Sequence, residues 1–323
     1  MLRIYFRFLF FVSVGFWGCS GPVDPVEPEP CGVSIASTWP EHLATDAHYL
    51  QDIEFHLSES VEDAVIITDL EGTQWMRDDG KTIGFTPLEP LKAQTSYTMG
   101  LEYCAGSPEI SFTTNSHGIA VTDLAFLQDT TFMVDLADAR FAEGGGVADI
   151  LLSLFDRQVL FQFTSVTESA IGFNFSVAKQ GTAFPEQDTC FRTMALEDVD
   201  FDNPMFLLEA DLLQFDAFLA ALSLRDFYVS GSVGPDGLSL AGISFEMTMD
   251  LREVTDVLGV NNYEEVCSLA ANVGSNCRPC PQDNVESCIT VSAMAIEGTV
   301  VPVEIETIEV ANTHPDCDKA DEE

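Results

Sequence analysis

Short runs of alternating apolar and polar residues, separated by turn signals, constrain the fold of this chain more than any other feature. In the first third, apolar side chains recur at every second position in Ile53–Leu57, Ile83–Phe85 and Tyr97–Tyr103. Turn-forming sequences such as Asp78-Asp79-Gly80 lie between these runs. A period of two puts the apolar side chains on one face of a strand, so residues 31–115 are predicted to form an antiparallel β-sandwich.

The second part, residues 118–312, continues the strand pattern with many phenylalanines. Strands are predicted at 131–136, 159–166, 171–177, 205–213 and 289–303. Between the last two lies a predicted hairpin, which runs from Phe227–Val233 through the turn Gly234–Gly237 to Leu238–Met249, with a bulge near Gly242.

Helical signals are few in this second part. Helical spacing of apolar residues predicts short helices at 147–154, 215–222, 251–258 and 263–271. The chain is therefore expected to be mainly β, with a sandwich followed by a larger antiparallel barrel or sandwich that has a few helices across one opening.

Acidic residues outnumber basic ones strongly. The formal net charge is −40, which repels the phosphate backbone of nucleic acids and makes them poor partners. The same charge repels anionic lipid headgroups, so attachment to a membrane would depend on an anchor. We expect no nucleic-acid partner.

The first residues have the layout of an export signal. Arg3 and Arg7 precede the apolar run Phe8–Phe16, which is too short to span a bilayer, and Gly18 stands before Cys19. This segment resembles the signal of bacterial lipoproteins, with departures at Phe16 and Trp17. The resemblance implies that residues 1–18 are removed and that Cys19 carries acyl chains such as palmitate. Since Ser20 follows the cysteine, it also implies the outer membrane. An ordinary signal peptide cut nearby, or an uncut anchor, is the alternative.

Residues 19–30 are rich in proline and acidic residues and cannot build a core. They are typical of an extended tether that lifts a folded part off a membrane surface. At the other end, residues 313–323 form an acidic tail.

The region 31–115 resembles bacterial Ig-like domains of the S-layer-associated type. The resemblance rests on TWPEHLATDAHYLQDIEFHLSESVEDAVI (38–66), IGFTPLEPLKAQTSYTMGLE (83–102) and ISFTT (110–114), with Leu43 where a turn glycine is common. It implies a spacer module. Cys31 begins its first strand and Cys104 ends a late one, and we predict that the two form a disulfide. The two-domain plan also resembles predicted lipoproteins in which such a module precedes an uncharacterised cysteine-bearing β domain.

Eight of the nine cysteines remain if Cys19 carries lipid, and an even number in an exported chain indicates disulfides. Beyond Cys31 and Cys104, the connectivity stays open for Cys190, Cys267, Cys277, Cys280, Cys288 and Cys317. The cluster Cys267–Cys288 has a spacing that zinc or a redox pair would also use, but crosslinks suit an oxidising compartment better.

Asp198, Asp200 and Asp202 form a weak calcium candidate, because carboxylate oxygens are the ligands that calcium prefers. A solvated acidic loop before Pro204 is the competing interpretation. We expect no metal and no cofactor.

No catalytic motif is recognisable, so we expect a protein without enzymatic activity that has a structural or binding role at the cell envelope. The alternative is a carrier that binds an apolar ligand in the second domain. A cavity lined by phenylalanines would favour the carrier, the candidates being Phe161, Phe163, Phe173, Phe175, Phe206 and Phe245. A periplasmic enzyme is a third hypothesis, which would need a cleft with converging polar groups.

Overall fold

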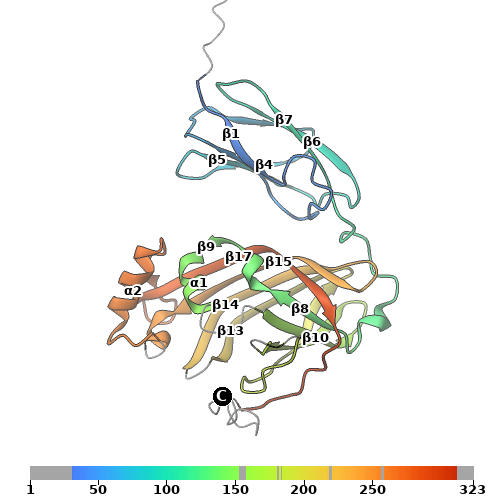
Figure 1. The fold of residues 1–323 in the computed structure, drawn as a ribbon, viewed down its shortest axis with the longest axis vertical. Coiled ribbons are helices and arrows are strands. Elements are labelled where there is room, and N and C mark those ends of the chain that lie inside the picture. The colour runs from blue at the N-terminus through green and yellow to red at the C-terminus, as the bar shows by residue number, and fades with distance from the viewer. Residues whose placement is uncertain are drawn as a thin grey trace, which may run out of the picture.

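The structure, a computed structural model, describes residues 31–152, 158–179, 182, 184–217, 220–255 and 258–310. The expected signal peptide, Cys19, the tether, Cys317 and the acidic tail lie outside these residues. The described chain is mainly β and forms a smaller sandwich and a larger barrel (Figure 1).

The sandwich contains two antiparallel sheets. One sheet has the order β1 (Ile35–Trp39), β2 (Ile53–Leu57), β5 (Thr82–Pro87) and β4 (Gly72–Met76). The other has the order β3 (Val65–Ile67), β6 (Ser96–Glu102) and β7 (Glu109–Thr113). Apolar side chains from both sheets fill the space between them, including Phe55, Ile83, Leu101 and Phe112. The alternation read from the sequence therefore gives the sandwich its core.

At Leu43, the backbone has φ 68°. This is the left-handed region that favours glycine, so a leucine holds a turn conformation that glycine would adopt more easily.

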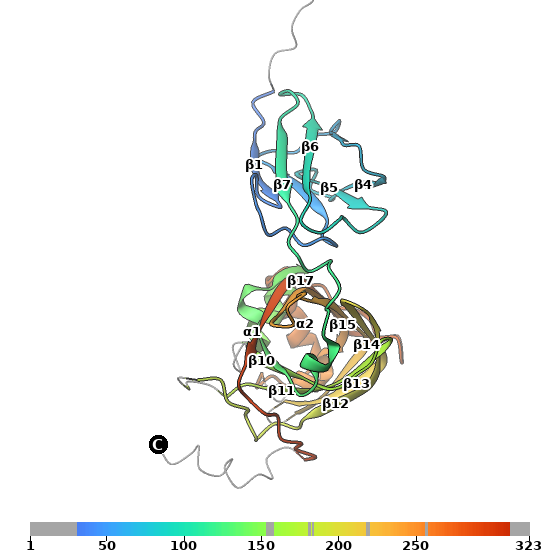
Figure 2. The same cartoon turned by 90° about the vertical axis from the view of Figure 1, so that its right-hand side faces the viewer.

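Eight antiparallel strands close into the barrel, and Figure 2 shows them nearly end-on as a ring. In order around the barrel they are β8 (Thr131–Asp135), β10 (Gln158–Val166), β11 (Ala170–Val177), β12 (Met194–Asp202), β13 (Met205–Ala217), β14 (Ala220–Val233), β15 (Ser239–Asp250) and β17 (Glu286–Val301). Two short strands, β9 (Arg140–Glu143) and β16 (Arg278–Pro279), pair with β17. Each main strand lies beside its neighbour in sequence, and β17 returns to pair with both β15 and β8.

Helices are short and gather at one end of the barrel. They are α1 (Gly145–Leu152), the 3-10 turn η3 (Leu251–Val254) and α2 (Tyr263–Asn272). Two further 3-10 turns, η1 (Leu124–Leu127) and η2 (Leu136–Asp138), flank β8. Among the described residues, no helix has both the length and the apolar character needed to cross a bilayer.

Two segments differ from the sequence-based prediction. Residues 215–222 were predicted to be helical, but the described residues of this segment are strand, since 215–217 end β13 and 220–222 begin β14. The acidic segment before Pro204 was interpreted as a loop, but it is strand β12, with Val199 and Phe201 buried and its acids exposed. The alternation was not recognised in the sequence because acidic residues dominate one face of the strand and only a few apolar residues mark the other.

The sandwich contacts the barrel through His48. Its Nε2 lies 2.9 Å from Ser232 Oγ, and its Nδ1 accepts a hydrogen bond from the backbone N–H of Leu50. The ring lies against Gly242, where φ is 59° and an added Cβ would overlap the imidazole. Gly242 is also the site of the predicted bulge in β15. The same glycine therefore bends the strand and makes room for the neighbouring domain.

A second contact joins the buried Glu54 of the sandwich to Arg140 of β9. His56 Nε2 lies 3.1 Å from the same carboxylate, and Arg140 lies over the ring of Trp39 at 5.1 Å. Met205 of the barrel also packs against the sandwich core. Charged, aromatic and apolar contacts thus join the two domains.

We predict that acid weakens the protein through these interface histidines. Burial, followed by the charge of nearby His117, lowers the pKa of His48 from 6.5 to about 3. Between those values the unfolded chain binds a proton that the folded chain does not, so the unfolding free energy falls as pH falls, by about 1.4 kcal/mol per pH unit. Urea unfolding at pH 7.5, 6.0 and 4.5 measures this slope.

His48→Gln should reduce the dependence of the unfolding free energy on pH by the equivalent of about one bound proton. The control is His42→Gln, at an exposed position of the same domain. Burial also lowers the pKa of His56 and of His117, so part of the slope should remain. An unchanged slope in His48→Gln would contradict the assignment.

Candidate functional site

The inside of the barrel is filled in one half and hollow in the other. In the filled half, Phe132 packs on Phe163, Phe163 on Phe173, and Phe173 on Phe206, with ring centroids 5.3 to 6.3 Å apart. Leu127 of η1 lies in the same cluster and is fully buried. Aromatic packing of this kind seals the half of the barrel next to η1.

A cavity of about 170 Å³ occupies the other half, beside α1 and the strand ends that lead to η3. All its lining residues are apolar. The aromatic ones are Phe141, Phe161, Phe173, Phe175, Phe227 and Phe245. The others are Val134, Leu136, Ala148, Val159, Val177, Met194, Leu196, Leu208, Leu213, Leu222, Leu224, Val229, Ile243, Met247, Met249, Val291 and Ile296.

Strand alternation places these side chains inside the barrel. Val159 is opposite Val177 and Phe161 is opposite Phe175 across β10 and β11, and the Phe161 and Phe175 rings meet edge-on at 5.0 Å. Bulges shift the register where strict alternation would turn an apolar side chain outward. In β14, a register shift between Arg225 and Tyr228 keeps both Leu224 and Phe227 on the cavity.

Several inward-facing side chains are only half-buried, which is the direct sign that the space between them is unfilled. Phe161, Phe175, Phe227 and Phe245 are all of this kind. In a fully packed barrel the same positions would be as buried as Phe132 and Phe163 in the sealed half.

Water is a poor occupant of this cavity. A buried water needs two to four polar partners, and no described lining side chain has an oxygen or nitrogen to offer. Without an occupant, the side chains that line the cavity also lack contact partners on one side. Apolar cavities of about 150 Å³ take up molecules as large as benzene. The site can therefore accept a small apolar molecule or part of a hydrocarbon chain.

The phenylalanines named from the sequence divide between the two halves. Phe161, Phe173, Phe175 and Phe245 line the cavity, whereas Phe163 and Phe206 belong to the sealed half. Sequence reasoning missed Phe141 and Phe227. Phe141 follows a break in the alternation, and the bulge in β14 shifts the face on which Phe227 lies.

Disulfides are present in both domains. The structure joins Cys31 to Cys104 across 73 residues, Cys267 to Cys277, and Cys280 to Cys288. Cys190 is also disulfide-bonded. The pair Cys277 and Cys280, which a redox site would need, belongs to two different disulfides.

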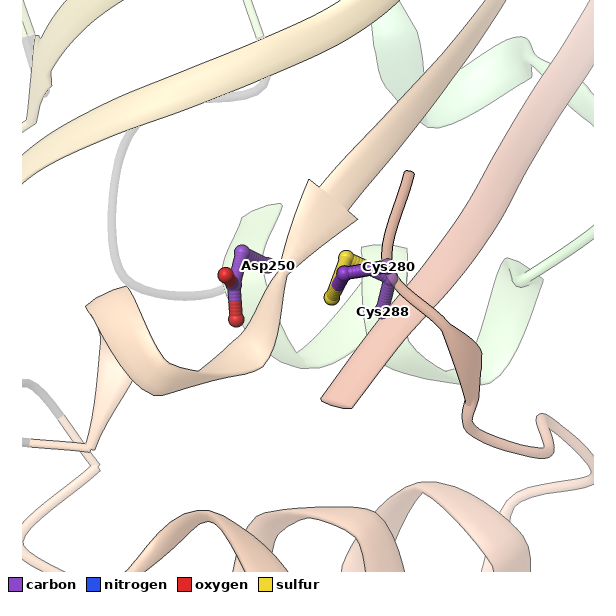
Figure 3. Close-up of side chains that lie close together, drawn as sticks. All are labelled: Asp250, Cys280 and Cys288. Carbon is purple, nitrogen blue, oxygen red and sulfur yellow. A yellow bond between two sulfur atoms is a disulfide. The ribbon is translucent and has the colours of Figure 1, made fainter. Parts of the chain in front are cut away.

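The candidate metal ligands form one group in the described part of the chain. Asp250, Cys280 and Cys288 each have a ligand atom within 4.8 Å of the others, and all three are buried (Figure 3). The two sulfurs are bonded to each other, as Figure 3 shows, and a disulfide sulfur lacks the negative charge of a thiolate ligand. The three aspartates proposed for calcium form no such group there. Asp198, Asp200 and Asp202 are exposed along β12.

Asp250 instead holds a network of hydrogen bonds at the end of β15. It accepts from Arg252 Nε at 2.9 Å, from Gln282 Nε2 at 2.9 Å and from Ser287 Oγ at 3.0 Å. Burial alone would raise the pKa of this carboxyl, but the hydrogen bonds from Arg252 and Ser287 outweigh it and hold the pKa below its ordinary value. The network fixes the loop that carries Cys280 against the barrel wall beside the cavity.

The chain matches no described protein family, and no characterised protein matches it in sequence. Among solved structures the similarities are weak. An L,D-transpeptidase from Mycobacterium smegmatis has a TM-score of 0.23 and 15% identity, with 48% of this chain and 79% of that one covered. The S-layer protein SbsC has a TM-score of 0.21 and 11% identity, with 85% of this chain and 54% of that one covered.

One expectation from the sequence is corrected by these similarities. We expected a protein without enzymatic activity, and the first of the two structures is an enzyme, so that expectation is withdrawn. A TM-score of 0.23 gives no reason to assign the activity of that enzyme to this chain.

We predict that Asp250→Asn destabilises the barrel by about 2–4 kcal/mol, because it removes a buried charge and leaves Arg252 and Gln282 with a weaker acceptor. Chemical unfolding measures the loss. Asp283→Asn is the matched control, since Asp283 binds the same Arg252 at 2.7 Å from an exposed position. Equal losses in the two variants would show that burial does not strengthen the Asp250 network.

Proposed function

We propose that this protein is a lipid-anchored protein of the bacterial envelope that binds an apolar molecule inside its barrel. The observation that carries the proposal is the cavity of about 170 Å³ with an entirely apolar lining. Eight-stranded barrels are either filled by side chains or wide enough for one small ligand. This barrel is sealed by phenylalanines in one half and left hollow in the other.

The stability cost of the cavity supports a role for it. Larger side chains at Ala148, Val159 or Val291 would fill the space and supply the missing contacts. Small and medium residues at these positions make sense if the cavity has an occupant. A bound apolar molecule would restore the missing contacts and stabilise the folded state by mass action.

Anchoring by Cys19 and an outer-membrane location remain part of the proposal, on the residues of the N-terminus. One arrangement then accounts for three segments, which are the sequence 1–18, the tether 19–30 and the S-layer-type Ig-like segment 31–115. The anchor would hold the chain at the membrane, the tether and the sandwich would lift it, and the barrel would present its binding site at a distance. The contacts of His48 and Glu54 with the barrel support a fixed spacing between spacer and site.

We predict that the purified chain, with Cys19→Ser so that no detergent is needed, binds benzene at one saturable site. Leu196→Trp should lower the affinity by about tenfold or more, a loss of about 1.4 kcal/mol, because the indole takes up cavity space. Isothermal titration calorimetry measures the affinity. The melting temperature should stay level or rise, since a void is filled.

Ala195→Trp is the matched control for this experiment. It adds the same side chain one position earlier on β12, where the residue is exposed on the outer face. Benzene binding should be unchanged in this variant. If the native chain shows no saturable binding, or if both variants bind benzene as the native chain does, the cavity is not the site.

Lipidation is tested separately by metabolic labelling with palmitate in a Gram-negative host. We expect label on the native chain and none on Cys19→Ser, because no other residue at the expected cleavage point offers a thiol. An unlabelled native chain would remove the anchor from the proposal and leave the binding site untouched.

A further inference from the structure

Phenylalanine is the commonest residue among the lining side chains that the barrel leaves partly open. Of the lining residues, nine are only half-buried, and five of these are phenylalanines. The five are Phe141, Phe161, Phe175, Phe227 and Phe245. An inward-facing side chain that is half-buried presents the rest of its surface to the cavity. An occupant therefore meets aromatic rings more often than any other kind of side chain.

Two of these rings face two others across the barrel. Phe161 lies on β10 and Phe175 on β11, whereas Phe227 lies on β14 and Phe245 on β15. In the order of the eight strands, β10 is four places from β14, and β11 is four places from β15. Strands four places apart in a closed ring of eight belong to opposite walls, as Figure 2 shows. The cavity therefore has aromatic rings on two opposite walls.

Ring contacts occur within each wall and not between the two walls. On the first wall, the Phe161 and Phe175 rings meet edge-on at 5.0 Å. On the other, Phe245 meets Phe141 of β9 edge-on at 6.4 Å. In the part of the chain that the structure describes, Phe245 contacts no ring other than Phe141, and Phe227 contacts no ring. The space between the two walls is thus available to a ring that does not belong to the protein.

The chemistry of the lining favours an aromatic occupant over a saturated one. Aromatic rings prefer edge-to-face or offset contacts at 4.5–7 Å, and such pairs contribute more than the area they bury. Three methionines, Met194, Met247 and Met249, also line the cavity, and thioether sulfur packs favourably on ring edges. Because no described lining side chain has an oxygen or nitrogen, a charged group on the occupant would be buried without a partner.

We propose that the occupant of the cavity is a small uncharged aromatic molecule, whose ring lies between Phe161 and Phe175 on one wall and Phe227 and Phe245 on the other. This inference rests on the proposed apolar site and names its ligand class. The volume of about 170 Å³ limits the molecule to about one ring with short apolar substituents, since benzene occupies cavities of about 150 Å³.

Calorimetric titration with benzene and with cyclohexane, a saturated ring of similar size, tests the inference. The protein is the chain with Cys19→Ser, with and without Phe227→Leu. Because the two ligands differ in their solubility in water, the informative quantity is the change that the variant causes in each dissociation constant. Phe227→Leu removes one ring and keeps the site apolar, so it should weaken benzene about threefold to tenfold and leave cyclohexane within about twofold.

Leu196→Val is the matched control, because it also enlarges the cavity at a half-buried lining position but removes no ring. It should change the binding of benzene and of cyclohexane by the same factor. If Phe227→Leu weakens benzene no more than cyclohexane, or if Leu196→Val weakens benzene as selectively as Phe227→Leu does, the aromatic inference is wrong and the apolar site stands. If the chain binds neither benzene nor cyclohexane, the proposed function itself fails.

Discussion

Closure of the barrel by β17 is the interaction on which the rest of this structure depends. Gly298 is paired with Leu240 of β15 on one side and with Val134 of β8 on the other. A Cβ at this position would lie 2.9 Å from a Val134 methyl carbon, so glycine permits the three strands to meet. The first and last strands of the barrel are thereby joined, and no long sheet edge is left to pair with another chain.

Once the sheet is closed, the size of its interior is set, and the side chains decide how much of it is filled. Bulky phenylalanines converge on the η1 side, and smaller residues such as Ala148 and Val291 face the cavity on the α1 side. The hollow half is the half braced from outside. The Asp250 network and the disulfides Cys267–Cys277 and Cys280–Cys288 hold α2 and the nearby loop against the strand ends. Together with the buried cluster formed by α1, η3 and α2 at this end, this bracing supports the wall around the cavity.

The contact between the two domains depends on the same wall. Gly242 bends β15 at a bulge, and the His48 ring occupies the space that its missing side chain leaves. Ser232, on the neighbouring strand, binds the imidazole. Because the sandwich contacts strands of the barrel wall, its position is tied to the shape of the barrel (Figure 1). The chain is strongly acidic and has few cations, and some of these cations have structural roles. Arg140 serves the domain contact, and Arg252 serves the loop network.

The sequence by itself determined the strand-rich class, the hairpin at Gly234–Gly237 and the bulge at Gly242, because each depends on neighbours in the chain. The presence of disulfides followed from the number of cysteines. It misread residues 215–222 and β12, where local charge and helical spacing hid strands that only tertiary pairing stabilises. The tertiary structure decided that the second domain is a closed barrel, and which phenylalanines meet. It also decided that a cavity remains beside Phe161, Phe175 and Phe245. A cavity depends on the packing of many side chains from strands that are distant in the sequence, so no local sequence pattern predicts it.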